Sequence, residues 1–212
     1  MKEDVLEQIV DDYLQMQGYF TTHNVRFNPP KDQHYAPQVE SVPSDIDVVG
    51  LHPRHTGARR VMVVSCKSWQ SGFAAPQILA QLRGEAKNPK RPRELQFREL
   101  WMPRWAQGFR KKIEDITGSR EFTYCLAVTR LQGDASGWAD DATIRECLGG
   151  NPLQFLTLKD MWASYSIPLR PRQLPARWGA WRSCLRPQVS PPRRRSRRPP
   201  APSTELLPRR RN

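Results

Sequence analysis

Two short strand-like segments carry charged residues where a strand is normally apolar. The first is Ser44-Asp45-Ile46-Asp47-Val48-Val49-Gly50-Leu51, and the second is Val61-Met62-Val63-Val64-Ser65-Cys66-Lys67-Ser68-Trp69. Charged side chains resist burial unless they are paired or bind something. The acids of the first segment and the lysine of the second therefore constrain how the two strands can be placed.

The charge of the chain is unevenly distributed. Of the net charge of +13 over 212 residues, residues 170–212 carry +12, from thirteen arginines and one glutamate. This segment also holds nine of the 20 prolines and shows no apolar periodicity, so we predict a disordered Arg/Pro-rich tail after a domain of residues 1–169. The tail is either a non-specific arm for polyanions or a solvated terminal extension.

The four cysteines are far apart in the sequence and form no Cys-x-x-Cys pair. This spacing argues against a zinc ribbon or a disulfide framework and fits a reducing compartment. No apolar run approaches the ~20 residues of a membrane span. The acidic, amphipathic N-terminus does not resemble a signal peptide. We therefore expect a cytoplasmic protein without membrane contact.

Hydrophobic periodicity predicts a mixed order of helices and strands. The predicted helices cover residues 3–16, 76–86, 103–116 and 140–148, and a last short helix starts near residue 157. The predicted strands cover residues 20–27, 45–51, 60–68, 122–129 and 153–158. Short loops join the first three strands, which predicts an antiparallel meander. The fold class is then α/β, with helices against one mixed sheet.

The period of two along a strand decides which charged residues share a face. Asp45 and Asp47 would share one face of their strand, and Ser65 and Lys67 one face of theirs. If these strands pair, a carboxylate and an ammonium group converge at one edge of the sheet. Magnesium binds oxygen ligands and needs only one or two carboxylates, and a nearby lysine can stabilise developing negative charge. The pattern is therefore typical of metal-assisted phosphodiester hydrolysis.

These segments resemble the PD-(D/E)xK nuclease superfamily. The resemblance rests on Glu7 in an N-terminal helix, Asp47 in a Ser-x-x-Asp-Val-Val strand, and Ser65-Cys66-Lys67 at the end of the next strand. It covers about residues 4–129 and is nearest to Mrr-type restriction endonucleases, whose lysine strand often ends in a run like Cys66-Lys67-Ser68-Trp69. It implies a restriction-endonuclease-like fold with an αβββαβ core, and a Mg²⁺- or Mn²⁺-dependent endonuclease that hydrolyses DNA.

The resemblance also implies a role for individual residues. Asp47 would be the central metal ligand, Lys67 the catalytic lysine, and Glu7 an acid that assists metal or water. The main-chain carbonyl of Cys66 would complete the metal shell. Asp45, Ser65 and Gln77 would be auxiliary residues.

Ser65 departs from the family pattern, which usually has Glu or Asp two residues before the lysine. Mrr-type proteins often carry Gln there, so a neutral residue is compatible with activity. The alternative is an inactive member that binds nucleic acid or a protein partner. Cleavage of two strands usually needs two sites, which leaves both a monomer and a homodimer open.

Residues 83–112 hold ten basic and three acidic residues, with Phe97, Trp101, Trp105 and Phe109 at spacings of four. The aromatic residues either stack on bases or form the buried stripe of an amphipathic helix, and we favour the stripe. In a nuclease, some of the basic side chains would contact DNA phosphates. The candidates are Lys87, Lys90, Arg91, Arg93, Lys111 and Lys112.

Overall fold

Five strands form one mixed sheet in the order β1-β2-β3-β5-β7. The first three pair antiparallel, and β5 and β7 extend the sheet in parallel. The meander and the mixed sheet predicted from the sequence are thereby confirmed. The strands are β1 (Phe20–Phe27), β2 (Ser44–Leu51), β3 (Val61–Lys67), β5 (Thr123–Val128) and β7 (Leu153–Thr157).

This computed structural model describes residues 5–33, 35–85 and 94–165. They belong to one compact unit, Met1–Pro168. The predicted tail of residues 170–212 lies outside the described residues. So do Glu3 and Asp4 of the predicted first helix.

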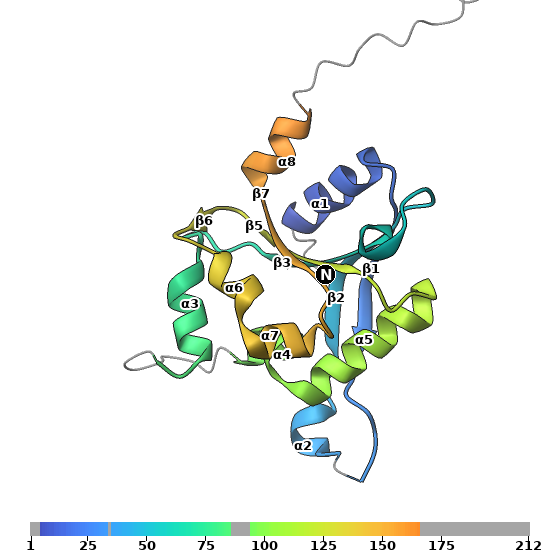
Figure 1. Cartoon of the computed structure of the whole chain (residues 1–212), viewed down its shortest axis with the longest axis vertical. Helices are drawn as coiled ribbons and strands as arrows, with labels where there is room; N and C mark the ends of the chain where they lie inside the picture. Colours follow the sequence, from blue (N-terminus) through green and yellow to red (C-terminus); the bar gives the residue numbers. More distant parts are fainter. Residues whose placement is uncertain (1–4, 34, 86–93, 166–212) are drawn as a thin grey trace, which may run out of the picture. The chain divides into compact units, whose positions relative to one another are not determined.

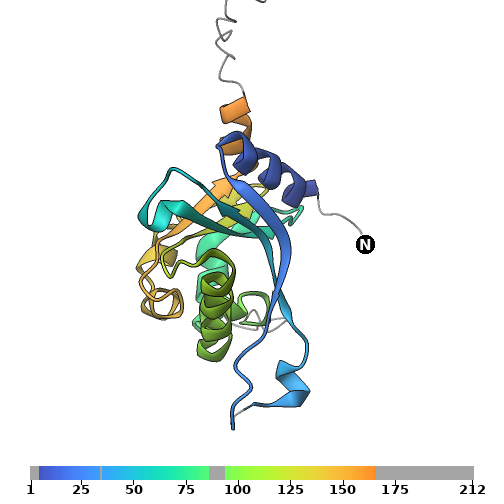
Figure 2. The same ribbon diagram turned by 90° about the vertical axis from the view of Figure 1, so that its right-hand side faces the viewer.

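Helices cover both faces of the sheet (Figures 1 and 2). One face is covered by α1 (Val5–Met16) and α8 (Leu158–Tyr165), which contact each other. The opposite face is covered by α3 (Ala75–Leu82), α4 (Arg98–Trp101), α5 (Pro103–Thr117), α6 (Ser136–Asp140) and α7 (Ala142–Cys147). Strand β5, which lies between β3 and β7, is consequently buried along its whole length, as its continuous apolar sequence predicts.

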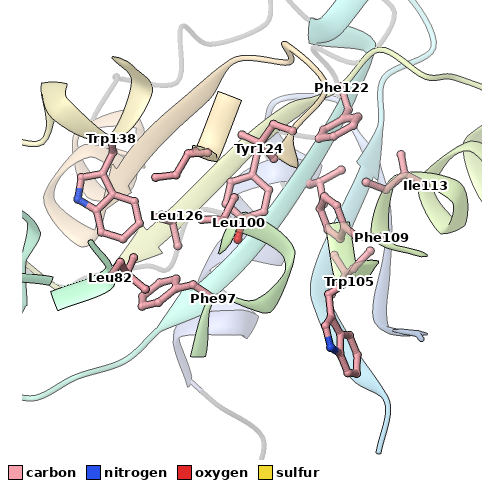
Figure 3. Packing of buried hydrophobic residues seen from close by; sticks show 14 of the residues in the cluster. Leu82, Phe97, Leu100, Trp105, Phe109, Ile113, Phe122, Tyr124, Leu126 and Trp138 are labelled. Atoms are coloured by element: carbon pink, nitrogen blue, oxygen red, sulfur yellow. The ribbon is translucent and has the colours of Figure 1, made fainter. Parts of the chain in front are cut away.

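Adjacent residues of β3 belong to different cores. Val63 packs on the α5 side and Val64 on the α1 side, as the period of two requires. The α5-side core is the larger, and Figure 3 shows its aromatic side chains packed together. Phe97, Trp105 and Phe109 are fully buried there, so their predicted burial is confirmed. They do not form the stripe of a single helix, because Phe97 precedes α4 whereas Trp105 and Phe109 lie on α5. Trp101 is half-buried against the same core.

Several short elements were not predicted. These are α2 (Pro37–Glu40), α4, α6, two 3₁₀ turns (Gly57–Arg60 and Glu94–Gln96) and the small parallel sheet of β4 (Phe73–Ala74) and β6 (Leu131–Gln132). Each is too short to show a period in the sequence. Helix α3 also ends at Leu82 rather than at residue 86, because Gly84 adopts a left-handed φ of 74° soon after it.

Arg104 fixes the long connection between β1 and β2 to helix α5. Its Nε donates to Glu40 Oε1 at 2.9 Å, and its Nη1 donates to Asp32 Oδ1 at 2.9 Å. Its Nη2 donates to the main-chain carbonyl of Pro30 at 2.8 Å. The connection is therefore anchored along much of its length by one guanidinium group.

Helix α5 passes very close to this connection at Gly108, where a Cβ atom would overlap the main-chain carbonyl of Asn28. We predict that Gly108→Ala lowers the free energy of unfolding by about 1–3 kcal/mol or more, because backbone atoms must move. Urea denaturation would measure the loss. Gly137→Ala is the matched control, since its Cβ would meet only a Leu79 side-chain carbon at 3.3 Å. Equal stability of Gly108→Ala and the wild type would contradict the prediction.

Candidate active site

The ladder between β2 and β3 opens at Asp47. Paired positions run from Leu51↔Val61 to Val48↔Val64, and Asp47 follows at the open end. There the Asp47 carboxylate replaces a strand partner, since its Oδ2 accepts the main-chain N–H of Cys66 at 2.6 Å. A side chain thus satisfies a backbone donor where the two strands separate.

Lys67 and Ser65 lie on one face of β3, as predicted. Lys67 Nζ donates to Ser65 Oγ at 2.9 Å, and it also lies 5.6 Å from the centre of the Phe97 ring. Ser65 is buried and Lys67 is half-buried. The ammonium group is thereby held at the end of β3, beside the opening at Asp47.

Two opposing influences act on the Asp47 carboxyl group. Burial is the larger one, and it raises the pKa of Asp47. The ammonium group of Lys67 and the N–H of Cys66 favour the ionised form and lower the same pKa. The net result is a pKa above the ordinary value, so Asp47 is a carboxylate that its surroundings only partly satisfy.

Glu99 lies close to these side chains, although it was not among the predicted site residues. It is only 7% exposed, and Tyr124 Oη donates to its Oε1 at 2.6 Å. Burial, followed by the negative charge of Glu99, raises the pKa of Tyr124 well above its ordinary value. The charge of Glu99 also raises the pKa of Asp47, after the larger effects of burial, Lys67 and Cys66.

One signal in the sequence could have pointed to Glu99. It is an acid between Phe97 and Leu100, in a segment where the neighbouring charges are mostly basic. A carboxylate so close to core residues needs a polar partner, and β5 supplies Tyr124. The partner lies 25 residues further along the chain, which is why local spacing alone did not reveal the pair.

Glu7 lies on the other side of the sheet, on α1. It is half-buried, and its charge contributes, after burial and Asp47, to the raised pKa of the Cys66 thiol. Cys66 packs in the α1-side core with Leu6 and Val10. The structure therefore brings Glu7 near the Cys66 side chain, while Lys67 and Ser65 lie on the opposite face.

Asp45 does not lie with Asp47, Ser65 and Lys67. It is 47% exposed at its side chain, and it pairs with Arg26 Nε at 3.8 Å across the strands. Strict alternation predicts Asp45 and Asp47 on one face, but β2 does not alternate strictly here. Ile46 and Val49 are three residues apart and would lie on opposite faces of an ideal strand, yet both pack in the same core. The cause is local: Asn24, between the residues that pair with Val48 and Ile46, has a left-handed φ of 52°.

The other predicted residues are on the surface or outside the described residues. Gln77 is exposed in the first turn of α3, so its auxiliary role stays a prediction. Lys111 is exposed on α5, with Asp115 at 3.5 Å, and Lys112 is half-buried. The remaining basic candidates, Lys87, Lys90, Arg91 and Arg93, lie outside the described residues.

The oxygen atoms at the opening suit a hard cation such as Mg²⁺ or Mn²⁺. In an extended strand the N–H and C=O of one residue point to the same side, so the Cys66 carbonyl faces the opening together with the N–H that Asp47 accepts. Within the described ranges, no three His, Cys, Asp or Glu side chains are grouped closely enough to hold a metal ion. Magnesium needs fewer protein ligands than that, because it keeps several waters.

No family model, curated protein or solved structure matches this chain. The site must therefore be interpreted from its own geometry. In the part of the chain that the structure describes, no helix is long and apolar enough to cross a membrane.

We predict that Asp47→Asn does not destabilise the fold at neutral pH and raises its free energy of unfolding. A raised pKa means that the ionised group disfavours the folded state, whereas Asn can still accept the Cys66 N–H. The advantage of the variant should shrink as pH falls through the folded pKa of Asp47 and vanish below the unfolded value of about 3.9.

Urea denaturation at several pH values in EDTA would measure this difference. The exposed Asp45→Asn is the matched control, and we expect no comparable gain from it. A loss of stability in Asp47→Asn that is largest at neutral pH would show that the carboxylate stabilises the fold.

Proposed function

We propose that this chain is a metal-dependent DNA endonuclease of the PD-(D/E)xK type. The observation that carries the proposal is the Asp47 carboxylate at the open end of the β2–β3 ladder, bonded to Cys66 N–H and next to the Lys67 ammonium group. The element order α1, β1, β2, β3, a helical connection and β5 supports it, because that is the αβββαβ order of the family.

The residues present fit a magnesium or manganese ion. Asp47 and the Cys66 carbonyl would hold the ion, and Glu7 would assist from α1. When bound, such an ion polarises the phosphate and lowers the pKa of a bound water. Asp47 must be ionised for this role. Burial disfavours its ionised form, and a bound cation would favour it.

Lys67 would act on the reacting phosphate. A water oxygen forms a new bond to phosphorus, the phosphorus–oxygen bond to the leaving group breaks, and the proton lost by the water balances the one gained by the leaving oxygen. The Lys67 ammonium group would stabilise the negative charge that develops on the phosphate oxygens. Its bond to Ser65 and its place above Phe97 hold the ammonium group at Ser65.

We predict that Asp47→Ala abolishes Mg²⁺- or Mn²⁺-dependent plasmid cleavage, because the central carboxylate is lost. Lys67→Ala should lower the rate by about 10²–10³, as for the loss of one stabilising group. Asp45→Ala is the control and should retain activity, since Asp45 pairs with Arg26 on the surface. Cleavage that survives both Asp47→Ala and Lys67→Ala would exclude the proposed function.

A second function is favoured by one observation: the partner of Lys67 on β3 is the neutral hydroxyl of Ser65, not a carboxylate. This is the pattern of a member that binds nucleic acid or a protein partner without cleaving DNA. Such a protein would retain DNA in a salt-sensitive manner and would show no metal-dependent cleavage.

DNA binding by the basic tail can be separated from binding by the folded unit. Because each phosphate contact adds to the salt dependence, deletion of residues 170–212 should reduce the slope of log K against log salt. We expect the shortened chain to keep part of its DNA affinity through basic residues such as Lys111 and Lys112, and Lys111→Ala/Lys112→Ala in that chain should lower it further. Filter binding at several salt concentrations measures both effects. Complete loss of binding with the tail would show that the folded unit is not a DNA-binding surface.

The remaining expectations follow from this function. Cleavage of both strands needs two sites, so a homodimer is the assembly proposed on DNA, and light scattering with and without a DNA duplex tests it. A cytoplasmic location is proposed with it, because DNA is the substrate and the cysteine spacing fits a reducing compartment.

A further inference from the structure

Ser65 lies at the centre of a connected set of polar side chains. Its hydroxyl accepts from Lys67 Nζ at 2.9 Å. Hydrogen bonds with Ser65 also contribute to the environments of Asp47 and Tyr124, where they oppose the larger effect of burial on each pKa. Tyr124 in turn donates to Glu99 Oε1 at 2.6 Å. Glu99 therefore adds a carboxylate to this set of side chains, although residue 65 itself is a serine.

The packing of α4 explains how Glu99 reaches the sheet. Phe97 and Leu100, on either side of it, are fully buried in the α5-side core. Phe97 also lies under the Lys67 ammonium group. This anchoring turns Glu99 toward β5 and holds its carboxylate at Tyr124, on the same side of the sheet as Ser65 and Lys67.

The charges in this set do not balance. Asp47 and Glu99 are two acidic side chains, whereas Lys67 brings one basic group to the set. A buried charge without an opposite partner is costly. The side chains that interact here would consequently be stabilised by an added cation.

We propose that Glu99, from helix α4, supplies the second carboxylate of the metal site, in place of the acid that Ser65 lacks. This inference rests on the proposed function and deepens it. Tyr124 packs in the α5-side core, and its hydroxyl donates to Glu99 Oε1 at 2.6 Å, which places the Glu99 carboxylate next to the side chains around Ser65. Tyr124 is then a positioning residue that orients the carboxylate.

The test measures Mn²⁺ affinity by electron paramagnetic resonance, on full-length protein and without DNA. Glu99→Gln keeps an acceptor for Tyr124 and removes the charge, and we expect it to weaken Mn²⁺ binding by about tenfold or more. The matched control is Glu146→Gln, at an exposed position on α7, which should bind Mn²⁺ like the wild type. In the double variant Ser65→Glu/Glu99→Gln, a carboxylate on β3 should restore much of the lost affinity.

The outcomes separate the two proposals. If the wild type binds Mn²⁺, Asp47→Asn does not, and Glu99→Gln binds like the wild type, then the inference about Glu99 fails and the metal site stands. If the wild type itself binds no Mn²⁺, the proposed function fails with it. Tyr124→Phe distinguishes a structural role: if it lowers stability as much as Glu99→Gln while both leave Mn²⁺ affinity unchanged, Glu99 serves only to satisfy Tyr124.

Discussion

The candidate site depends on a single hydrogen bond from the Cys66 main chain to the Asp47 carboxylate. It lies where β2 and β3 separate, and it replaces a ladder partner that β2 no longer supplies. Without it, a backbone donor at the end of a buried strand would be unsatisfied. Because Cys66 is adjacent to Lys67 in the sequence, the same bond also places the Asp47 carboxylate near Lys67.

The sheet arrangement limits where such chemistry can occur. Helices cover both faces, and β5 is buried over its full length, so the inner strands leave little room for charged groups along their length. Asp47, Ser65 and Lys67 lie where the β2–β3 ladder stops, in the middle of β2 and near the end of β3. Glu7 approaches the same end from the α1 side through Cys66, and Glu99 approaches from the α5 side through Tyr124. The two helical layers thus each contribute one acid.

Much of the fold could be predicted from the sequence because its long elements have strong periods. Strand β1, helix α5 and the buried strand β5 were located to within one or two residues. The antiparallel pairing of the first three strands was also predicted correctly, although the connection between β1 and β2 contains the short helix α2. The pairing of Ser65 with Lys67 on one face followed from the period of two. The Asp47 carboxylate was expected near Lys67 for the same reason, once the two strands were placed side by side.

Other features could not be predicted, because they depend on contacts between distant segments. The role of Glu99 becomes visible only in the folded structure, where Tyr124 of β5 bonds to it. The position of α2 likewise depends on the bond from Arg104 of α5 to Glu40. The separation of Asp45 from Asp47 depends on one left-handed residue in the neighbouring strand, Asn24. A strand period describes an ideal pleat, and it fails where a partner strand distorts that pleat.

The Cys66 thiol has a consequence for how the site would respond to its chemical surroundings. Burial, with Asp47 and Glu7 close by, raises its pKa far above the ordinary value, so the sulfur remains protonated at neutral pH. The thiolate is the species that reacts with alkylating agents and peroxides. The Cys66 thiol, which is also buried, is therefore less reactive toward both than an exposed cysteine would be.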